Sequence, residues 1–538
     1  DESTAIDIWY HRNSSCPNRG YWYYSKQATG HHALCYSTTP PMDARFWFPC
    51  YDRPLDKAEQ GVSLNVTVPD SFSVCANGLL DSVTHDSITH TKTFHWNHHY
   101  PIATYLVVFA ASVWSEYVQF YCPEGSDSVR VHTFCWPEDS ANIAYQMRSV
   151  PEMLSFYAES LRFGPYPFEI YGHVVTSPFV WGGMENQTMI MLRREQIANA
   201  LISHEMSHMW WGDMVTCVDF RNVWLNEGFA TYADALWYRH ERGQRSFQTL
   251  MNTRASDYFS EDARHRFATY DPPIEDVYAW GTIYCKGSWI QHMLRYLEHD
   301  TISSSPGHFF QALRAYGDSF KYGTANTEDY RRIHEQISGL DLGWFFDEWL
   351  YQAGYPQYRL AWSVEPVGEN WRLITCLSQN NGNNAPAVFH MPIQLKLCGT
   401  SQDSLHILSV SSNPQIDSFI LGFRPDSISF DPGRWILKKV QVLSDIARTD
   451  VLRPEMEFLS VVPAVTRGRI RVRYWLPSTL VGSELVLFDR AGRRLARQPV
   501  PVGRHEVMFD CSAQPAGVYL LKLCAGPVHE VCKMVVSR

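Results

Sequence analysis

The segment SHEMSHMWWGDM (residues 203–214) carries two histidines, His204 and His208, with Glu205 between them. On a helix, residues four apart lie on one face, about 6 Å apart along the axis, so their imidazoles can bind one zinc ion at about 2.0–2.1 Å. Glu205 is rotated by about 100° from His204, so it lies beside such a metal and can take a proton from a metal-bound water. The pattern predicts a helix over 195–211 that carries a hydrolytic zinc site.

A catalytic zinc ion needs a third protein ligand and an open position. Glu227 supplies that ligand, because it lies in the first turn of a second predicted helix, NVWLNEGFATYADALW (222–237), with 18 residues between it and His208. The alternative is an ordinary helix with two structural histidines, and the availability of Glu227 favours the metal site. We therefore predict one zinc ion per chain.

Two further segments carry residues that could choose the substrate. In FVWGGMENQTM (179–189), Gly182 and Gly183 let the backbone approach a ligand closely, and Glu185 would be costly to bury unless it met a cation such as a substrate α-ammonium. Tyr284 could donate a hydrogen bond to an oxyanion beside the zinc. Taken alone, the first segment is better interpreted as a glycine turn with a solvated glutamate. Tyr284, taken alone, is better interpreted as an aromatic residue of the core.

Composition and charge exclude several classes of protein. The chain of 538 residues is 45% hydrophobic and 19% charged, which is typical of globular domains, and its net charge of −10 gives no basic footprint for nucleic acid. Its longest apolar run, Tyr105 to Trp114, is too short to span a membrane. The chain begins at Asp1 instead of Met, so we expect a processed chain or a fragment.

The 13 cysteines form no CxxC pair, which argues against a zinc ribbon or a redox motif. A bridge between Cys524 and Cys532 and a set of buried free thiols are both open interpretations.

The sequence predicts a multidomain α+β protein with four parts. Alternating strands fill 1–112, where Asn77-Gly78 is typical of a hairpin turn, and helical periodicity dominates 113–355. Short alternating strands over 356–442 predict a small β-sandwich. After a linker around 443–455, a last β module occupies 455–538.

Four motifs occur together in a fixed order: GGMEN (182–186), HEMSH (204–208), NEGFA (226–230) and Tyr284 before KGS. In this order they resemble the gluzincin aminopeptidase family typified by aminopeptidase N. DARFWFPCYDRPLDKA (43–58) resembles that family's N-terminal β-domain, and FFDEWLYQAGYP (345–356) resembles the end of its catalytic domain. The resemblance covers about 36–440.

The resemblance implies a thermolysin-like α/β catalytic domain and a zinc aminopeptidase acting on peptides with a free N-terminus. It implies that zinc is bound by His204, His208 and Glu227, with Glu205 as the general base and Tyr284 as the group that stabilises the oxyanion. Glu185 would anchor the substrate's amine, and the remaining substrate-binding residues would be Gly182, Gly183, Met184 and Asn186.

The chain also departs from the family pattern. Where the family has a Gln or Glu that helps to bind the amine, this chain has Thr38 and Pro40, so we expect anchoring to rest more heavily on Glu185. The first 30 residues or so do not resemble a complete N-terminal domain. The large C-terminal helical domain of many relatives is also absent, which predicts an open site that admits longer peptides.

The last module has its own resemblance. LFDRAGRRLARQ (487–498), GVYLLKL (517–523) and KMVVSR (533–538) resemble the C-terminal sorting domains of the bacterial type IX secretion system. This implies a bacterial protein that is secreted or held at the cell surface and that contacts the secretion machinery. A generic Ig-like adhesion or spacer module is the alternative.

Two other functions compete with the aminopeptidase hypothesis. A gluzincin endopeptidase of broader specificity would share the zinc chemistry without needing a free amine, and Pro40 is the feature that favours it. A non-catalytic surface binding protein that keeps the fold is disfavoured, because every metal ligand and the base are present.

Overall fold

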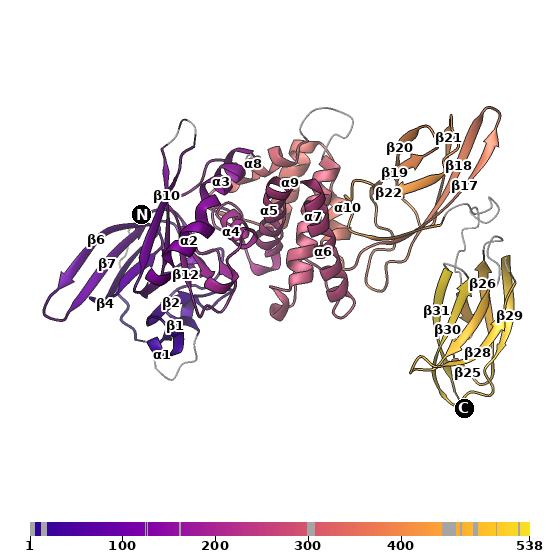
Figure 1. Cartoon of the computed structure of the whole chain (residues 1–538), viewed down its shortest axis with the longest axis horizontal. Coiled ribbons are helices and arrows are strands. Elements are labelled where there is room, and N and C mark those ends of the chain that lie inside the picture. The colour runs from indigo at the N-terminus through magenta and orange to yellow at the C-terminus, as the bar shows by residue number, and fades with distance from the viewer. Residues whose placement is uncertain are drawn as a thin grey trace. The chain divides into compact units, whose positions relative to one another are not determined.

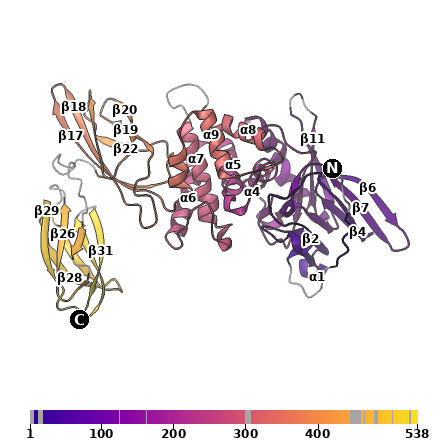
Figure 2. The same ribbon diagram turned by 180° about the vertical axis from the view of Figure 1, so that it is seen from behind.

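The computed structural model describes residues 6–11, 19–123, 125, 127–160, 163–298, 307–443, 459–462, 465–476, 483–501, 503–525 and 528–537. The chain folds into two compact units. The first holds the described residues up to Tyr355 together with the short segments 383–386 and 434–437, and the second holds the described residues that remain. Both units are seen from opposite sides in Figure 1 and Figure 2.

The first unit begins with a β-region of short strands. These are β1 (Gly20–Tyr24), β2 (Leu34–Thr38), β3 (Lys57–Ala58), β4 (Val62–Pro69), β5 (Ser73–Ala76), β6 (Leu79–Asp86), β7 (Thr91–His98), β8 (Ile102–Ala103) and β9 (Phe109–Ser112), with the short helix α1 (Lys26–Thr29) after β1. They form a four-stranded sheet in the order β1-β2-β9-β5, a three-stranded sheet in the order β4-β7-β6, and the pair β3-β8. Side chains alternate between the two faces of a strand, which is why the sequence alternation in 62–69 marks β4 correctly.

The predicted hairpin at Asn77-Gly78 is wrong. Strand β5 pairs with β9 and strand β6 pairs with β7, so this dipeptide leads from one sheet to another. The buried Asn77 amide donates to the carbonyls of Leu106 (3.1 Å) and Gln187 (2.6 Å) and accepts from Val108 N (2.7 Å). These tertiary hydrogen bonds override the local turn preference and tie the β-region to the segment that follows Glu185.

A mixed five-stranded sheet follows the β-region. Its strands are β10 (Ser115–Tyr121), β11 (Val129–Cys135), β12 (Tyr171–Thr176), β13 (Gly183–Met184) and β14 (Ile190–Arg193), in the order β10-β11-β12-β14-β13. Strands β11, β12 and β14 are parallel, and the two outer strands run antiparallel to their neighbours. The edge strand β13 therefore carries Gly183 and Met184 at the margin of the sheet.

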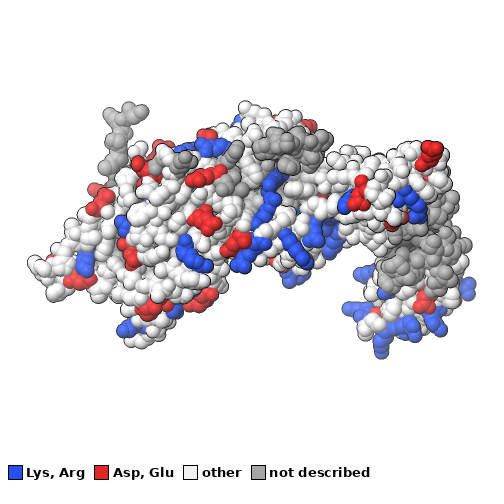
Figure 3. Space-filling model, turned by 45° about the horizontal axis from the view of Figure 1, so that its top comes forward, with Lys and Arg blue, Asp and Glu red and all other residues white. Residues whose placement is uncertain are grey.

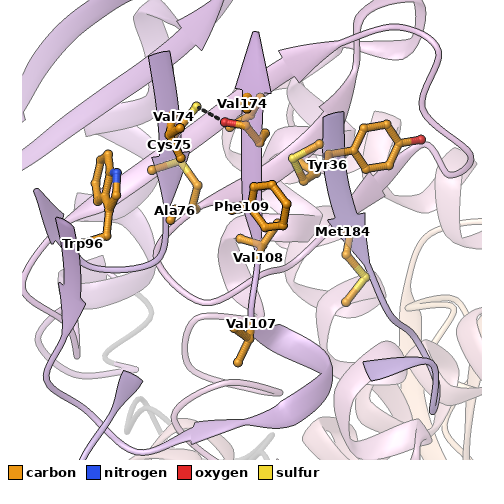
Figure 4. Close-up of a cluster of buried hydrophobic side chains, with 14 of the residues drawn as sticks. Tyr36, Val74, Cys75, Ala76, Trp96, Val107, Val108, Phe109, Val174 and Met184 are labelled. Carbon is orange, nitrogen blue, oxygen red and sulfur yellow. Dashed lines mark hydrogen bonds between the residues drawn. The ribbon is translucent and has the colours of Figure 1, made fainter. Parts of the chain in front are cut away.

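The β-region and this sheet share one hydrophobic core. Figure 4 shows Val174 and Met184 beside Tyr36, Val108 and Phe109, and the same buried cluster includes Met189 and Met191. Because Met184 is 4% exposed, the strand that bears the GGMEN motif is held in place by the packing of the β-region.

Helices form the rest of the first unit (Figure 1). They are α2 (Ser140–Gln146), α3 (Val150–Ser155), α4 (Asn199–Ser207), α5 (Trp224–Arg242), α6 (Gln244–Asp262), α7 (Gly287–Glu298), α8 (Phe309–Phe320), α9 (Thr327–Ser338) and α10 (Gly343–Trp349), with the strand pair β15 (Thr216–Cys217) and β16 (Thr324–Ala325). Helix α5 packs against α4, α6 and α7. Its residues from Trp224 to Trp237 are all buried, so it is the central helix of this region.

Helices α5 and α7 meet at a contact between two glycines. A Cβ atom on Gly228 would lie 2.9 Å from the Cα atom of Gly287 and 3.0 Å from its carbonyl carbon. Gly228 directly follows Glu227, and Gly287 comes three residues after Tyr284. The absence of side chains at this contact therefore brings Glu227 and Tyr284 close together.

The second unit is all β in its described residues. Its first part contains β17 (Gln357–Val367), β18 (Asn370–Gln379), β19 (Pro392–Cys398), β20 (Asp403–Ser409), β21 (Gln415–Leu421), β22 (Ser427–Phe430) and β23 (Lys439–Leu443). They form two sheets, β21-β18-β17-β23 and β20-β19-β22. The predicted linker around 443–455 lies almost wholly outside the described residues.

The C-terminal module also has two sheets. Its strands are β24 (Leu459–Val462), β25 (Val465–Thr466), β26 (Arg469–Leu476), β27 (Glu484–Phe488), β28 (Arg494–Pro499), β29 (Gly503–Asp510), β30 (Gly517–Ala525) and β31 (Val528–Val536). The sheet orders are β24-β26-β29 and β25-β31-β30-β27-β28, and buried residues of both sheets pack in one core.

The bridge considered between Cys524 and Cys532 does not form. In the register of β30 and β31, Cys524 lies opposite His529 and Cys532 lies opposite Leu521, and no disulfide joins the two cysteines. None of the described helices is long and apolar enough to cross a membrane.

The contact between Gly228 and Gly287 gives a test in which two effects have opposite signs. Helix propensity favours Gly228→Ala by about 1 kcal/mol, whereas overpacking against rigid backbone costs about 1–3 kcal/mol. We expect overpacking to win, because the neighbouring atoms belong to the backbone, and the apparent melting temperature to fall. Gly422→Ala is the control, because its Cβ atom would have no neighbour within 4 Å. A melting temperature raised by Gly228→Ala would contradict the close approach of the two helices.

Candidate active site

The two histidines lie at the end of a helix shorter than predicted. Helix α4 covers Asn199–Ser207 instead of 195–211, because residues 194–196 form a 3-10 turn and the next two residues are extended. His208 follows the last residue of α4 but keeps helical dihedral angles (φ −61°, ψ −24°). His204 and His208 therefore still share a face, and their Nε2 atoms are 3.3 Å apart.

Three ligand atoms converge on one point. The Glu227 Oε2 atom lies 3.4 Å from the Nε2 atom of His204 and 3.4 Å from that of His208. This oxygen is buried and has no hydrogen-bond partner among the described residues. A tetrahedral zinc ion with bonds of about 2.0–2.1 Å separates neighbouring ligand atoms by about 3.3–3.4 Å. The donor set and its spacing therefore fit zinc.

The opposite ring nitrogens hold both imidazoles in the orientation that a metal requires. His208 donates from Nδ1 to the carbonyl of Trp211 (3.0 Å), and His204 Nδ1 lies 3.5 Å from the carboxylate of Asp234. Asp234 is in turn paired with the buried Arg254. When the rings are neutral, these contacts keep the proton on Nδ1, so each Nε2 atom directs its lone pair toward Glu227 and the position that a metal would occupy.

The electrostatics of the site favour a cation. Burial disfavours a charged imidazole, yet the carboxylates of Asp234, Glu227 and Glu205 outweigh burial and raise the pKa of His204 to about 10. In the same way, Glu185 and Glu227 outweigh burial and raise the pKa of His208 to about 9. Without a metal, the protons on the two rings provide the positive charge of the site. A bound zinc ion would replace these protons and provide the positive charge instead.

Glu205 lies beside the ligand triangle, as predicted. Its carboxylate, that of Glu185 and the His208 ring have ligand atoms that all lie within 4.8 Å of one another. Burial and the negative charges of Glu185 and Glu227 raise the pKa of Glu205, against the opposing effect of the histidines. A raised pKa brings this carboxyl closer to the range that suits a general base near neutral pH.

Gly183 is the residue that allows strand β13 to approach Glu205. A Cβ atom at this position would lie 2.2 Å from Glu205 Oε1. Any side chain here would displace either Glu205 or strand β13. Steric exclusion therefore explains why this position of the GGMEN motif is a glycine.

These groups line one cavity of about 530 Å³. Its walls include all the predicted site residues except Asn186. The other lining residues come from the β-region, the segment before β13, the helices α4, α5 and α6, and the segment before Tyr284: Pro40, Trp181, Ala200, Leu201, Asp234, Leu250, Thr253, Arg254, Asp257, Tyr278 and Trp280. Asn186 is fully buried outside the cavity walls, and its amide donates to the carbonyl of Leu106 (3.3 Å). Its side chain joins the β-region, and the role of Asn186 in substrate binding stays a prediction.

Tyr284 lies in a π-helix, Trp280–Lys286, that leads directly into α7. Its ring stacks on His204 with centroids 6.1 Å apart and an interplanar angle of 20°. Desolvation and the nearby carboxylate of Glu227 raise the pKa of the phenol well above its usual range. The hydroxyl therefore keeps its proton at neutral pH and can donate a hydrogen bond in the cavity.

The β-region reaches the site at two further points. Pro40 lines the cavity, whereas Thr38 is buried on β2 and does not. The Asn226 amide donates to the hydroxyl of Tyr105 (3.2 Å) and accepts from Cys217 N (3.3 Å). Since Asn226 precedes Glu227, this hydrogen bond fixes the first turn of α5 against the β-region.

Sequence reasoning missed Asp234, Arg254 and Tyr105. A signal for Asp234 exists, because it lies seven residues after Glu227 and so on the same face of α5. No local pattern marks Arg254 or Tyr105, whose positions depend on how α6 and the β-region pack.

Two parts of the chain match models of known protein families, and together they contain the residues of the cavity. Residues 145–349 match the Peptidase family M1 domain, and residues 5–106 match the Peptidase M1 N-terminal domain. The chain is 27% identical over 383 residues to Aminopeptidase M1-C of Oryza sativa subsp. japonica, which covers 66% of this chain and 41% of that protein. It is 26% identical over 340 residues to Glutamyl aminopeptidase of Homo sapiens, which covers 59% of this chain and 34% of that protein.

Another relative matches more of the chain. Probable M1 family aminopeptidase 2 of Encephalitozoon cuniculi (strain GB-M1) is 24% identical over 461 residues, which is 79% of this chain and 49% of that protein. The chain thus spans less than half the length of each of these curated relatives.

The contact between Asp234 and His204 predicts a specific loss of zinc affinity. Removing such a partner of a histidine ligand typically weakens metal binding by about 10–100-fold, so we expect that loss in Asp234→Asn. The measurement is zinc competition against a chelator of known affinity. Asp257→Asn is the control, because Asp257 lines the same cavity but accepts from the Trp280 indole (3.0 Å) and not from a ligand. Unchanged zinc affinity in Asp234→Asn would show that this carboxylate does not orient His204.

Proposed function

We propose that this chain, which carries the N-terminal and peptidase domains of family M1, is a zinc-dependent aminopeptidase that removes N-terminal residues from peptides. The observation that carries the proposal is the triangle of His204, His208 and Glu227 in a cavity that also holds Glu205, Glu185 and Tyr284. Zinc bound at the triangle would polarise the scissile carbonyl and lower the pKa of the attacking water.

The residues of the chain then perform the proton transfers. Glu205 takes a proton from the attacking water and returns it to the amine that leaves. The Tyr284 hydroxyl donates a hydrogen bond to the carbonyl oxygen as negative charge develops there. Both groups line the cavity, and desolvation keeps the phenol protonated.

Glu185 gives the site its requirement for a free amine. Its carboxyl group is 7% exposed, and burial together with the charge of Glu227 raises its pKa. A carboxylate in such surroundings is stabilised by a cation, and the α-ammonium of a peptide is a cation of suitable size. In this proposal the ammonium binds Glu185, and the first peptide bond is thereby placed at the zinc.

One observation favours an endopeptidase as the second candidate. Pro40 lines the cavity where an amide or carboxylate would help to bind the amine, and Thr38 does not reach it. The amine would then be bound by Glu185 alone. The site would therefore distinguish less strongly between a peptide with a free N-terminus and one with a blocked N-terminus.

For the C-terminal module we propose a sorting domain of the type IX secretion system, and hence a bacterial protein carried to the cell surface or secreted. The support is the motif resemblance. The LFDRAGRRLARQ motif lies on the hairpin of β27 and β28, the GVYLLKL motif lies on β30, and most of KMVVSR lies on β31. In this proposal the module contacts the secretion machinery.

The proposed function is tested with one peptide in two forms, one with a free N-terminus and one N-acetylated. We expect cleavage of the free form only, and a zinc chelator should abolish it. Glu185→Gln should lower kcat/KM for the free form by about 10–100-fold, which is the usual worth of a hydrogen bond to a charged group, while zinc content stays unchanged.

Glu205→Gln is the matched comparison, since it replaces another buried glutamate of the cavity and should remove catalysis with zinc still bound. Equal internal cleavage of both peptide forms by the unaltered chain would favour the endopeptidase and refute the role of Glu185. Loss of zinc from Glu185→Gln would refute the assignment of this residue to the substrate.

A further inference from the structure

The C-terminal module has a charge opposite to that of the whole chain. Residues 459–538 contain twelve Lys and Arg but five Asp and Glu, a net charge of +7, whereas the chain as a whole carries −10. In Figure 3, Lys and Arg side chains gather over the described part of this module, with few acidic side chains among them. A local excess of this size attracts anionic partners.

The basic side chains of the two sheets differ in their partners. On the three-stranded sheet, Arg469 pairs with Asp510 (3.3 Å), while Arg471 (3.1 Å) and Arg473 (2.8 Å) share Glu506. On the five-stranded sheet, no described carboxylate forms an ion pair with the following four side chains: Arg494, Arg497, Lys522 and Lys533. The three-stranded sheet thus has two carboxylates for its three described arginines, so most of the uncompensated charge among the described side chains belongs to the five-stranded sheet.

The strand register places these four side chains on one face. Leu485, Leu487, Leu521 and Leu523 fill the core, so the residues that alternate with them face outward. One outward row across the sheet is Arg497, Val486, Lys522 and Val531, and the next row is Arg494, Phe488, Leu520 and Lys533. We call these two rows the basic sheet face.

The basic sheet face is also apolar between its charges. Leu520 is 40% exposed and Val531 is 51% exposed. Val486 is buried although it is not part of the core, and its row neighbours are Arg497 and Lys522, whose methylene stems can cover it. The basic sheet face thus has cations on strands β28, β30 and β31, with aliphatic side chains beside them in the same two rows.

We propose that the basic sheet face binds the surface of a membrane that carries anionic lipid headgroups. Phosphate groups of such lipids match the four uncompensated cations, and the exposed aliphatic side chains match the boundary between headgroups and acyl chains. A soluble polyanion such as nucleic acid would use the cations but would leave Leu520 and Val531 without a role. The interaction is independent of the peptidase site.

The expected strength follows from the number of cations. Each basic side chain at an anionic membrane surface strengthens binding roughly fivefold at moderate ionic strength, and the effect decays within a Debye length of about 8–10 Å. Four side chains predict a preference for anionic over neutral membranes of several hundred-fold, which high salt should remove.

The test uses the full chain and sedimentation with vesicles of 30% phosphatidylglycerol in phosphatidylcholine, compared with pure phosphatidylcholine. We expect binding to the anionic vesicles only. Arg497→Gln combined with Lys522→Gln should weaken binding about 25-fold, because two uncompensated cations are removed. Arg469→Gln combined with Arg471→Gln removes the same charge from the other sheet, where acidic residues already compensate it, and should weaken binding less than threefold.

Three outcomes would overturn the proposal. They are equal binding to both kinds of vesicle, equal weakening by the two double variants, and tighter binding to a DNA duplex than to anionic vesicles. The first would mean that charge is irrelevant, the second that only net charge matters, and the third that the partner is a polyanion. Melting temperature and zinc content, measured on every variant, identify any loss that comes from unfolding.

Discussion

The structure depends on the burial of several carboxylates around one point. Glu185, Glu205 and Glu227 are each less than 8% exposed, and oxygen atoms of Glu185 and Glu205 lie within 4.8 Å of each other. At that distance two negative charges repel by on the order of 3 kcal/mol even in a moderately polarisable protein environment. Such a cluster is stable only if cations are bound within it. Protonated His204 and His208, or a zinc ion in place of their protons, and the ammonium group of a peptide can be those cations.

The surrounding helices fix the positions of these carboxylates and of the groups that interact with them. Helix α4 presents His204 and the residue that follows the helix presents His208, while α5 presents Glu227. The glycine contact between α5 and α7 brings the phenol of Tyr284 beside them. Asp234 and Arg254 hold one imidazole from behind. Glu227 Oε2 is left without a hydrogen bond among the described residues, which is the state expected of a ligand that awaits a metal.

The β-region also helps to position the residues of the cavity. Its core packs against Met184. Its Asn77 donates to the carbonyl of Gln187, which precedes the two histidines, and its Tyr105 accepts from Asn226, which directly precedes Glu227. The strand that carries Gly183 and Met184 is therefore positioned by residues outside the matched range 145–349. This packing gives a physical reason for the two matched ranges of this chain, 5–106 and 145–349, to lie in one compact unit.

Sequence periodicity was enough to place the residues that share a helix. The i, i+4 spacing of His204 and His208 and the place of Glu227 in the first turn of a helix follow from local geometry, so both could be predicted. The limits of α4 could not, because a 3-10 turn and extended backbone replace its predicted first turn. The fate of Asn77 and Asn186 depends on carbonyl groups more than 25 residues away, and no local pattern reports such partners.

The most direct measurement is X-ray absorption at the zinc edge of the zinc-loaded chain. The account predicts a shell of nitrogen and oxygen atoms only, at about 2.0–2.1 Å, with the outer-shell scattering of two imidazole rings. A sulfur atom at about 2.3 Å, or a shell without imidazole, would contradict the central claim that two histidines and a glutamate hold the metal.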